Sequence, residues 1–227
     1  MINKKIGLFF GTFDPIHDGH IEVAKYILNN YFSDEVWLVI TPQNPEKKFI
    51  KISNFSHRYK MAQIATKKID NVKPSKAEQN LPIPNYTIDT LDHISEKFKS
   101  FEFSLIIGQD NFEKFDSWKS HEKIIENYKI LIYPRLGGDK KTEIKKLKNI
   151  IHLKGAAVDI SSSEVREKIK NKYHVTFYNK KKLEKILTKI LIVKSQKEIK
   201  NDVLVSKSLN GLIKKYESYL TKYILKI

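Results

Sequence analysis

The stretch IGLFFGTFDPIHDGH, residues 6–20, decides the fold because an apolar run leads directly into a turn and then a helix. Residues 6–10 have the length and composition of a buried strand. The segment GTFDP that follows is built from turn-forming residues, and His17 and His20 lie where the next amphipathic segment begins. A strand, a turn and a helix in this order predict the first unit of a parallel α/β sheet.

The same alternation continues along the chain. We expect buried strands at Ile6–Phe10, Val36–Ile40, Phe103–Ile107, Lys129–Tyr133 and Ile150–Leu153. Helical periodicity predicts helices over Gly19–Asn30, Ser56–Lys68 and Thr87–Lys97. The segment Pro74–Pro84 carries three prolines without periodicity, and we interpret it as a loop. Strands that alternate with helices predict an α/β, Rossmann-like, doubly wound parallel sheet, whose ligands bind beyond the carboxyl ends of the strands.

The character of the chain changes after about Tyr178, where the strand–turn–helix rhythm ends and lysine-rich amphipathic stretches begin. This change predicts one α/β domain over residues 1–178 and a C-terminal helical extension over residues 179–227. The sequence leaves open what the extension does. It does not determine the oligomeric state either, and a homo-oligomer is one possibility that stays open.

The composition limits the class of protein. No stretch approaches the ~20 apolar residues that span a bilayer, and the apolar run near residue 6 is too short for a secretory signal. The chain has no cysteine, which excludes disulfides and thiolate metal sites. We therefore expect a cytoplasmic protein with no membrane partner.

The net charge of +16 comes almost entirely from lysine, because the arginines are Arg58, Arg135 and Arg166 alone. Specific nucleic-acid readers favour arginine for its bidentate fork. No basic run here is interleaved with aromatic residues as a stacking groove would be. The charge pattern therefore disfavours a nucleic-acid partner and favours small phosphorylated substrates.

The turn after the first strand has the chemistry of a phosphate site. The N-terminus of a helix offers free N–H groups and partial positive charge. Two imidazoles at that position can each donate a hydrogen bond to a phosphate oxygen and stabilise charge on a reacting phosphoryl group. A metal pair is the alternative, but no third ligand with matching spacing follows. Chance histidines in a structural turn are the remaining interpretation.

Two segments resemble the signatures of the nucleotidyltransferase superfamily that carries a T/HxGH turn. GTFDPIHDGH is similar to the first signature, and ISSSEVR, residues 160–166, is similar to the second. Ser161 and Glu164 also form an S-x-x-E capping box that opens a helix. The resemblance implies that His17 and His20 are catalytic. It implies an ATP site formed by Gly11, Thr12, Phe13, Gly108, Asp110, Ile160, Ser161, Ser162, Ser163 and Arg166.

Three further segments resemble the bacterial nicotinate-nucleotide adenylyltransferase family. They are NYTIDTL at 85–91, LIIGQDNFEKFDSW at 105–118 and PQNPEKK at 42–48. The chain departs from the family pattern at Asn85, where serine is usual, and at Glu46 and Lys47, where proline and histidine are usual. The resemblance implies a mononucleotide site formed by Asp14, Lys48, Tyr86, Thr87, Trp118 and Arg135.

Each of these residue types suits such a ligand. Trp118 can stack on a pyridine ring, although a core tryptophan is the alternative. Backbone N–H groups of the helix that Thr87 opens can hold a carboxylate. Lys48 can neutralise a phosphate, although a solvated surface lysine is an equal alternative.

The resemblance implies an enzyme that joins ATP and nicotinate mononucleotide into nicotinate adenine dinucleotide and pyrophosphate, with Mg²⁺ accompanying ATP. Its partners are then two small molecules. Two alternatives stay open: a pantetheine-phosphate adenylyltransferase, and a non-catalytic module that binds nucleotides or nucleic acid. The sequence does not decide between nicotinate and nicotinamide mononucleotide.

Overall fold

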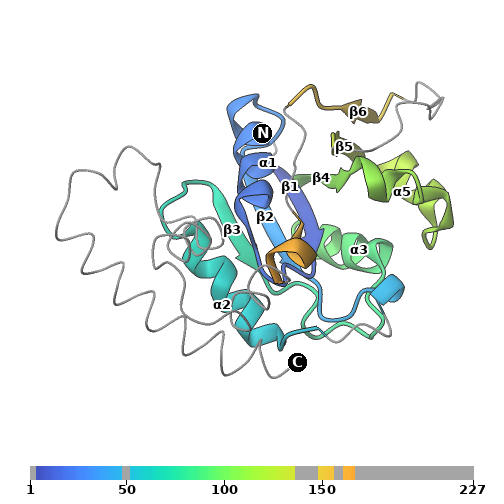
Figure 1. The fold of residues 1–227 in the computed structure, drawn as a ribbon. Helices are drawn as coiled ribbons and strands as arrows, with labels where there is room; N and C mark the ends of the chain where they lie inside the picture. Colours follow the sequence, from blue (N-terminus) through green and yellow to red (C-terminus); the bar gives the residue numbers. More distant parts are fainter. Residues whose placement is uncertain (1–3, 48–51, 136–147, 156–160, 167–227) are drawn as a thin grey trace, which may run out of the picture.

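The computed structural model describes residues 4–47, 52–135, 148–155 and 161–166 (Figure 1). One sheet of six parallel strands in the order β3-β2-β1-β4-β5-β6 forms its centre. The strands are β1 Lys4–Gly11, β2 Glu35–Ile40, β3 Val72–Ser75, β4 Phe101–Gly108, β5 Lys129–Tyr133 and β6 Ile150–His152. This is the strand order of a Rossmann fold, and it confirms the fold class expected from the sequence.

Helices cover both faces of the sheet (Figure 1). They are α1 Asp18–Asn29, α2 Phe55–Thr66, α3 Thr87–Lys97, α4 Gln109–Phe112 and α5 His121–Asn127, with 3-10 turns at Pro45–Lys47 and Phe115–Ser117. The apolar sides of α1 and α2 pack on one face, where Ile27 and Met61 are buried in the same core. The apolar sides of α3 and α5 pack on the other, where Leu91 and Ile124 are buried.

The expectation of a loop over Pro74–Pro84 is wrong at its start. Strand β3 extends through Pro74 and Ser75, which pair with Leu38 and Val39 of β2. Proline lacks a backbone N–H and is tolerated where a strand has only one neighbour. β3 is an edge strand, which is why a proline is compatible with it and why composition alone pointed to a loop.

The other expected elements agree with the structure within a few residues. The helix over Thr87–Lys97 and the strand over Lys129–Tyr133 have the expected bounds. Helices α4 and α5 are too short to show periodicity in the sequence, and the residue pattern missed them. The extension over 179–227 lies outside the described residues. Within the described part, no helix is both long enough and apolar enough to cross a bilayer.

The topology places two glycines side by side at one edge of the sheet. β1 ends at Gly11 and β4 ends at Gly108, and these two strands are neighbours in the sheet. From β1 the chain continues to β2 and β3 on one side of the sheet, and from β4 it continues to β5 and β6 on the other side. At such a switch point a crevice opens beyond the carboxyl ends of the two central strands. The motif that follows Gly11 therefore lies at the position where α/β sheets bind ligands.

Candidate active site

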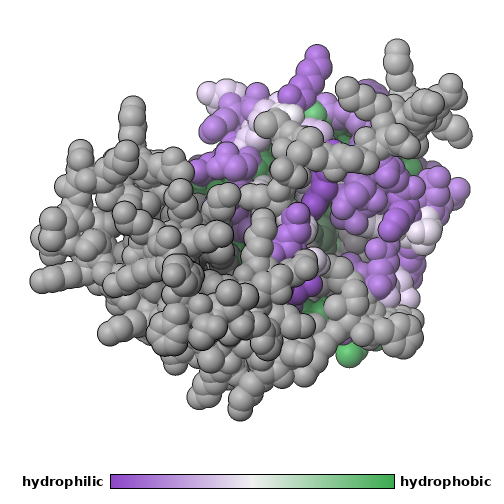
Figure 2. Space-filling model, viewed as in Figure 1, coloured by the Kyte–Doolittle hydropathy of each residue, from purple (hydrophilic) through white to green (hydrophobic). Residues whose placement is uncertain are grey.

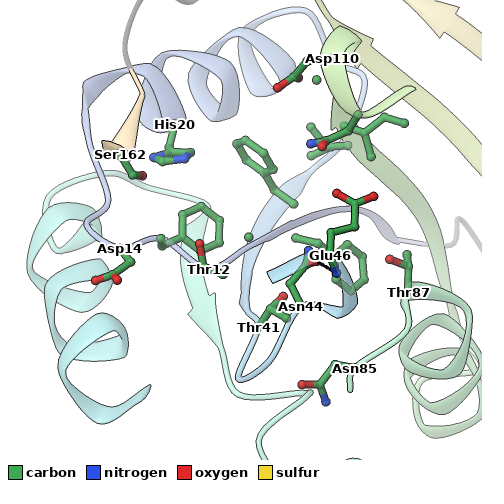
Figure 3. A pocket seen from close by; sticks show the side chains of 18 of the residues that line it. Thr12, Asp14, His20, Thr41, Asn44, Glu46, Asn85, Thr87, Asp110 and Ser162 are labelled. Atoms are coloured by element: carbon green, nitrogen blue, oxygen red, sulfur yellow. Dashed lines mark hydrogen bonds between the residues drawn. The ribbon is translucent and has the colours of Figure 1, made fainter. Parts of the chain in front are cut away.

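A cavity of about 450 Å³ opens beyond the carboxyl ends of β1 and β4. Every described residue that the sequence assigned to ATP, to the mononucleotide or to catalysis lines it. Figure 3 shows His20 and Ser162 on one side of this cavity, with Asn85 and Thr87 on the other. Two assigned residues, Lys48 and Ile160, lie outside the described part of the chain. The structure thus brings together segments that are far apart in the sequence.

The segment 161–166 contacts the turn after β1 directly. Ser162 Oγ donates to the carbonyl oxygen of Pro15 at 2.9 Å, and Arg166 donates from Nη1 to the carbonyl oxygen of Asp14. The expected capping box is present, since Ser161 N donates to Glu164 Oε2 at 2.8 Å and Glu164 N donates to Ser161 Oγ at 3.1 Å. Two helix N-termini, that of α1 and that of the segment after Ser161, therefore open on the same cavity.

His17 and His20 form a stacked pair at the start of α1. Their ring centroids are 3.7 Å apart, and the backbone N–H of His17 donates to His20 Nδ1 at 3.2 Å. Because Nδ1 of His20 accepts a hydrogen bond, a neutral His20 ring carries its proton on Nε2. His20 thus has an N–H donor at Nε2. The residue lines the cavity, where a ligand oxygen can accept that hydrogen bond.

The environment of His17 keeps its imidazole neutral. The side chain is 1% exposed, and burial lowers its pKa to about 4, with the positive charge of Arg135 adding to the effect. Neither ring nitrogen has a hydrogen-bond partner among the described residues. A buried donor without a partner costs about 1–3 kcal/mol. A phosphate oxygen in the cavity would satisfy it.

Phe13 gives the turn its shape. Its φ of 47° lies in the left-handed region, which is uncommon for an aromatic residue, and its ring packs 4.8 Å from that of His20. A Cβ on Gly11 would meet ring carbons of Phe13 at 3.0–3.3 Å. The absence of a side chain at Gly11 therefore lets the Phe13 ring pack closely against the backbone, and the residue with the unusual φ is Phe13.

Gly108 has a similar role at the end of β4. A Cβ there would lie 2.4 Å from Asp110 Oδ1 and 3.1 Å from the Tyr133 ring. The absence of a side chain lets the Asp110 carboxylate fold back over the strand end, where Arg135 Nε lies 3.4 Å from it. This places one carboxylate and one guanidinium on the cavity lining beside β4.

The opposite side of the cavity is formed by the start of α3 and by Trp118. Tyr86 is the N-cap residue of α3 and makes no side-chain capping bond, so its side chain satisfies none of the first backbone N–H groups of the helix. Trp118 is half-buried and packs 5.2 Å from the Phe115 ring. It packs against a core cluster and also lines the cavity, so its position is compatible with either interpretation of this tryptophan.

Asn85 joins two loops next to this wall. Its backbone N–H donates to the carbonyl oxygen of Gln43 at 2.9 Å, and its Oδ1 accepts from Gln43 N at 3.0 Å. This pair of bonds fixes the loop after β2 against the start of α3. The departure from the usual serine thus has a structural role that sequence analysis did not assign.

Arg58 is the most important positioning residue that sequence analysis missed. It is 1% exposed, and its guanidinium donates to the carbonyl oxygens of Ser53 at 2.8 Å, Thr12 at 2.6 Å, Thr41 at 2.8 Å and Pro42 at 3.4 Å. One side chain from α2 therefore joins the turn after β1 to the loop after β2. In the sequence it lies in the segment HRYKMAQIA, residues 57–65, and sequence analysis assigned it no role.

Two buried carboxyls complete the lining. Asp14 is 3% exposed, and its Oδ2 accepts from Ser53 N at 3.0 Å. Glu78 is 1% exposed and accepts from Thr90 Oγ1 at 2.7 Å; burial raises the pKa of its carboxyl. Nothing in the sequence pattern distinguished Glu78 from a surface glutamate.

Among the described residues, no group of three His, Asp or Glu side chains is arranged to hold a metal ion.

The crevice at the switch point, lined by two helix N-termini and two histidines, has the features expected of a nucleotide site in the nucleotidyltransferase class. A cytidylyltransferase-like family model matches residues 8–168. A protein of Flavobacterium psychrophilum is 44% identical over 172 residues, 75% of this chain and 89% of its own length; its name is "Probable nicotinate-nucleotide adenylyltransferase". A relative from Christiangramia forsetii with the same name is 42% identical over 77% of this chain and 90% of its own length.

Solved structures agree. The nicotinic acid mononucleotide adenylyltransferase of Plasmodium falciparum, complexed with NaAD, superposes with a TM-score of 0.61 at 25% identity, covering 72% of this chain and 83% of that chain. The same enzyme complexed with APC gives a TM-score of 0.59. The chain belongs to the nicotinate-nucleotide adenylyltransferase family, nucleotidyltransferases of NAD biosynthesis.

Proposed function

We propose that this chain joins ATP and nicotinate mononucleotide to give nicotinate adenine dinucleotide and pyrophosphate, with the described cavity as the active site. The observation that carries the proposal is the contact between the turn after β1 and the segment 161–166. That contact supports one triphosphate site formed from both segments. The uncapped start of α3 and Trp118 support a second subsite for a flat, negatively charged ring.

The reaction requires positioning and charge neutralisation more than acid–base chemistry. The 5′-phosphate oxygen of the mononucleotide attacks the α-phosphorus of ATP in line, forming a P–O bond as the bond from the α-phosphorus to the bridging oxygen breaks. The electron pair leaves with pyrophosphate. Because the attacking phosphate is already anionic, no side chain has to take a proton from it. Catalysis then rests on holding the two phosphates and on stabilising negative charge.

We assign the ATP side to the two convergent segments. Backbone groups of Gly11, Thr12 and Phe13 line the base of the site, and the N–H donors of His17 and His20 stabilise charge on the α- and β-phosphates. The helix start at Ser161, Ser162 and Ser163, with Arg166, holds the outer phosphates. Gly108 leaves room for the ribose, whose hydroxyls donate to Asp110.

Arg166 retains donors for this task. A guanidinium has five N–H groups, and the structure uses Arg166 for Asp14 and Ser163. A divalent ion enters with ATP as part of the substrate, because Mg²⁺ is commonly held by substrate phosphates and water. It would neutralise charge on the leaving pyrophosphate.

We assign the mononucleotide side to the opposite wall. Trp118 stacks on the pyridine ring, and the backbone N–H groups at Tyr86 and Thr87 bind the carboxylate. Arg135 attracts the 5′-phosphate, and Lys48 does so from the loop after β2. Asp14 belongs to this side as well: its Oδ2 holds that loop through Ser53 N, and the residue lines the cavity.

We also propose that residues 1–178 form the catalytic domain and that residues 179–227 are an extension to it. The extent of the family-model match, residues 8–168, supports this division.

The test is pyrophosphate release from MgATP with each candidate acceptor. Nicotinate mononucleotide should give rapid release and a product with the mass of nicotinate adenine dinucleotide. Phosphopantetheine should give none. Release with phosphopantetheine alone would favour the pantetheine-phosphate alternative, and no release with any acceptor would favour a binding module.

A further inference from the structure

We propose that Lys119 is a specificity residue that favours nicotinate over nicotinamide mononucleotide by placing a positive charge at the ring subsite. The inference rests on the proposed function, since it concerns the choice between two acceptors of the same reaction. The two mononucleotides share ribose, phosphate and ring, and they differ by a carboxylate in place of a neutral carboxamide. An ammonium near that group distinguishes them through charge.

The position of Lys119 is fixed from two sides. Its Nζ lies 2.8 Å from both carboxylate oxygens of Asp89, in the first turn of α3. The same Nζ lies over the face of Tyr86, 4.9 Å from the ring centroid. Tyr86 is the N-cap residue of α3, so the ammonium is held at the uncapped start of that helix.

Of the two residues in this ion pair, only Lys119 lines the cavity. Lys119 is the one lysine among the described residues that line the cavity, whereas Asp89 does not line it. Its neighbours on the lining are Tyr86, Thr87 and Trp118, the residues to which we assign the ring and its carboxylate. Glu46 lines the same cavity with the opposite charge. This makes the ammonium of Lys119 the charged group of this wall that attracts a carboxylate.

The chain supplies a matched control in Lys123. Its Nζ lies 2.6 Å from Asp92 Oδ2, so it joins α5 to α3, as Lys119 joins the segment just before α5 to the same helix. The exposed fractions are similar, 48% and 47% for Lys119 and Asp89 against 52% and 45% for Lys123 and Asp92. Lys123 does not line the cavity. Hydrophilic side chains cover the region of α5 in Figure 2, as expected for a surface that carries exposed ion pairs.

The experiment measures kcat/KM for both mononucleotides in the wild type, Lys119→Gln, Lys119→Arg and Lys123→Gln. In Lys119→Gln, the nicotinate-to-nicotinamide ratio should fall about fivefold, the scale of one half-exposed charge screened by water and salt. The loss should fall on the nicotinate substrate. Lys119→Arg and Lys123→Gln should keep the wild-type ratio. Raising the salt concentration should lower the ratio in the wild type and leave it unchanged in Lys119→Gln.

Equal losses for both mononucleotides in Lys119→Gln would overturn the inference, because they would indicate a structural role. An equal fall of the ratio in Lys123→Gln would do the same. Both results leave the proposed function intact. A wild-type protein that turns over neither mononucleotide would overturn the proposed function, and this inference with it.

Discussion

Ser162 donates a hydrogen bond to the backbone carbonyl oxygen of Pro15 across 147 positions of the chain, at 2.9 Å. Pro15 belongs to the turn after the first strand, and Ser162 begins the last described helical segment. Two segments that are far apart in the sequence, and that we assign to phosphate binding, thus line one cavity. The predictions below test what each part of this wall contributes.

Replacing His20 should impair turnover more than binding. In His20→Ala the Nε2 donor is lost, and a donor aimed at developing charge contributes about 100- to 1000-fold to kcat. We expect kcat to fall by that amount while the Kd for ATP changes less than tenfold. Steady-state kinetics and calorimetric titration with ATP measure the two quantities. Comparable losses in both would show that His20 only binds.

His17 should make stability depend on pH. Its folded pKa of about 4 lies below the ordinary histidine pKa of 6.5, so between these pH values the unfolded chain binds a proton that the folded chain does not. Its stabilising contribution is full above pH 6.5 and is lost as pH falls toward 4, by about 3 kcal/mol.

Urea unfolding at pH 7.5 and 4.5 measures this loss. His17→Asn, which cannot titrate there, should lose less stability over the same interval than the wild type. An identical decrease in both proteins would mean that His17 is not held neutral.

Arg58 should be essential for stability although it is a charged residue. In Arg58→Met the stem is kept, but four carbonyl oxygens lose their donor, and we expect the free energy of unfolding to fall by about 3 kcal/mol. Lys60→Met, an exposed position on the same helix, should change it by less than about 0.5 kcal/mol. Denaturant unfolding compares the two variants. If both lose little, Arg58 does not hold the loops together.

Gly108→Ala should impair ATP binding through the position of the Asp110 carboxylate. Gly108 has a φ of −77°, which alanine adopts readily, so the change acts through its methyl group. That methyl would meet the Asp110 carboxylate and displace it from the strand end. We expect KM for ATP to rise about tenfold. The control is Gly155→Ala, whose Cβ would contact Tyr26 at 3.1 Å outside the active-site cavity. This variant should leave the KM for ATP unchanged. An equal rise of KM in both variants would contradict the role assigned to Gly108.

The sequence was sufficient for the parts of this fold that follow from apolar periodicity. Buried parallel strands such as Lys129–Tyr133 are continuous apolar runs, and α3 has a clear stripe through Ile88, Leu91 and Ile94. Strand β3 was missed because an edge strand with Pro74 has the composition of a loop. Short helices such as α5 have too few turns to show a period.

The candidate site divides in the same way. The positions of His20 and Ser162 on the cavity were predictable because each lies in a turn whose pattern is local in sequence. Arg58, Asn85 and Glu78 were not, because their role is to bind backbone or side-chain groups of other segments. Such contacts exist only once the sheet brings the loops together. The tertiary structure therefore adds the positioning residues.

The central claim is that one triphosphate contacts both ends of the domain. A crystal structure of the protein with a non-hydrolysable ATP analogue tests this directly. We predict phosphate oxygens within about 3 Å of His20 Nε2 and, on the same molecule, of donors from Ser162, Ser163 or Arg166. A triphosphate that contacts the 11–20 turn alone, or the 161–166 segment alone, would contradict the account.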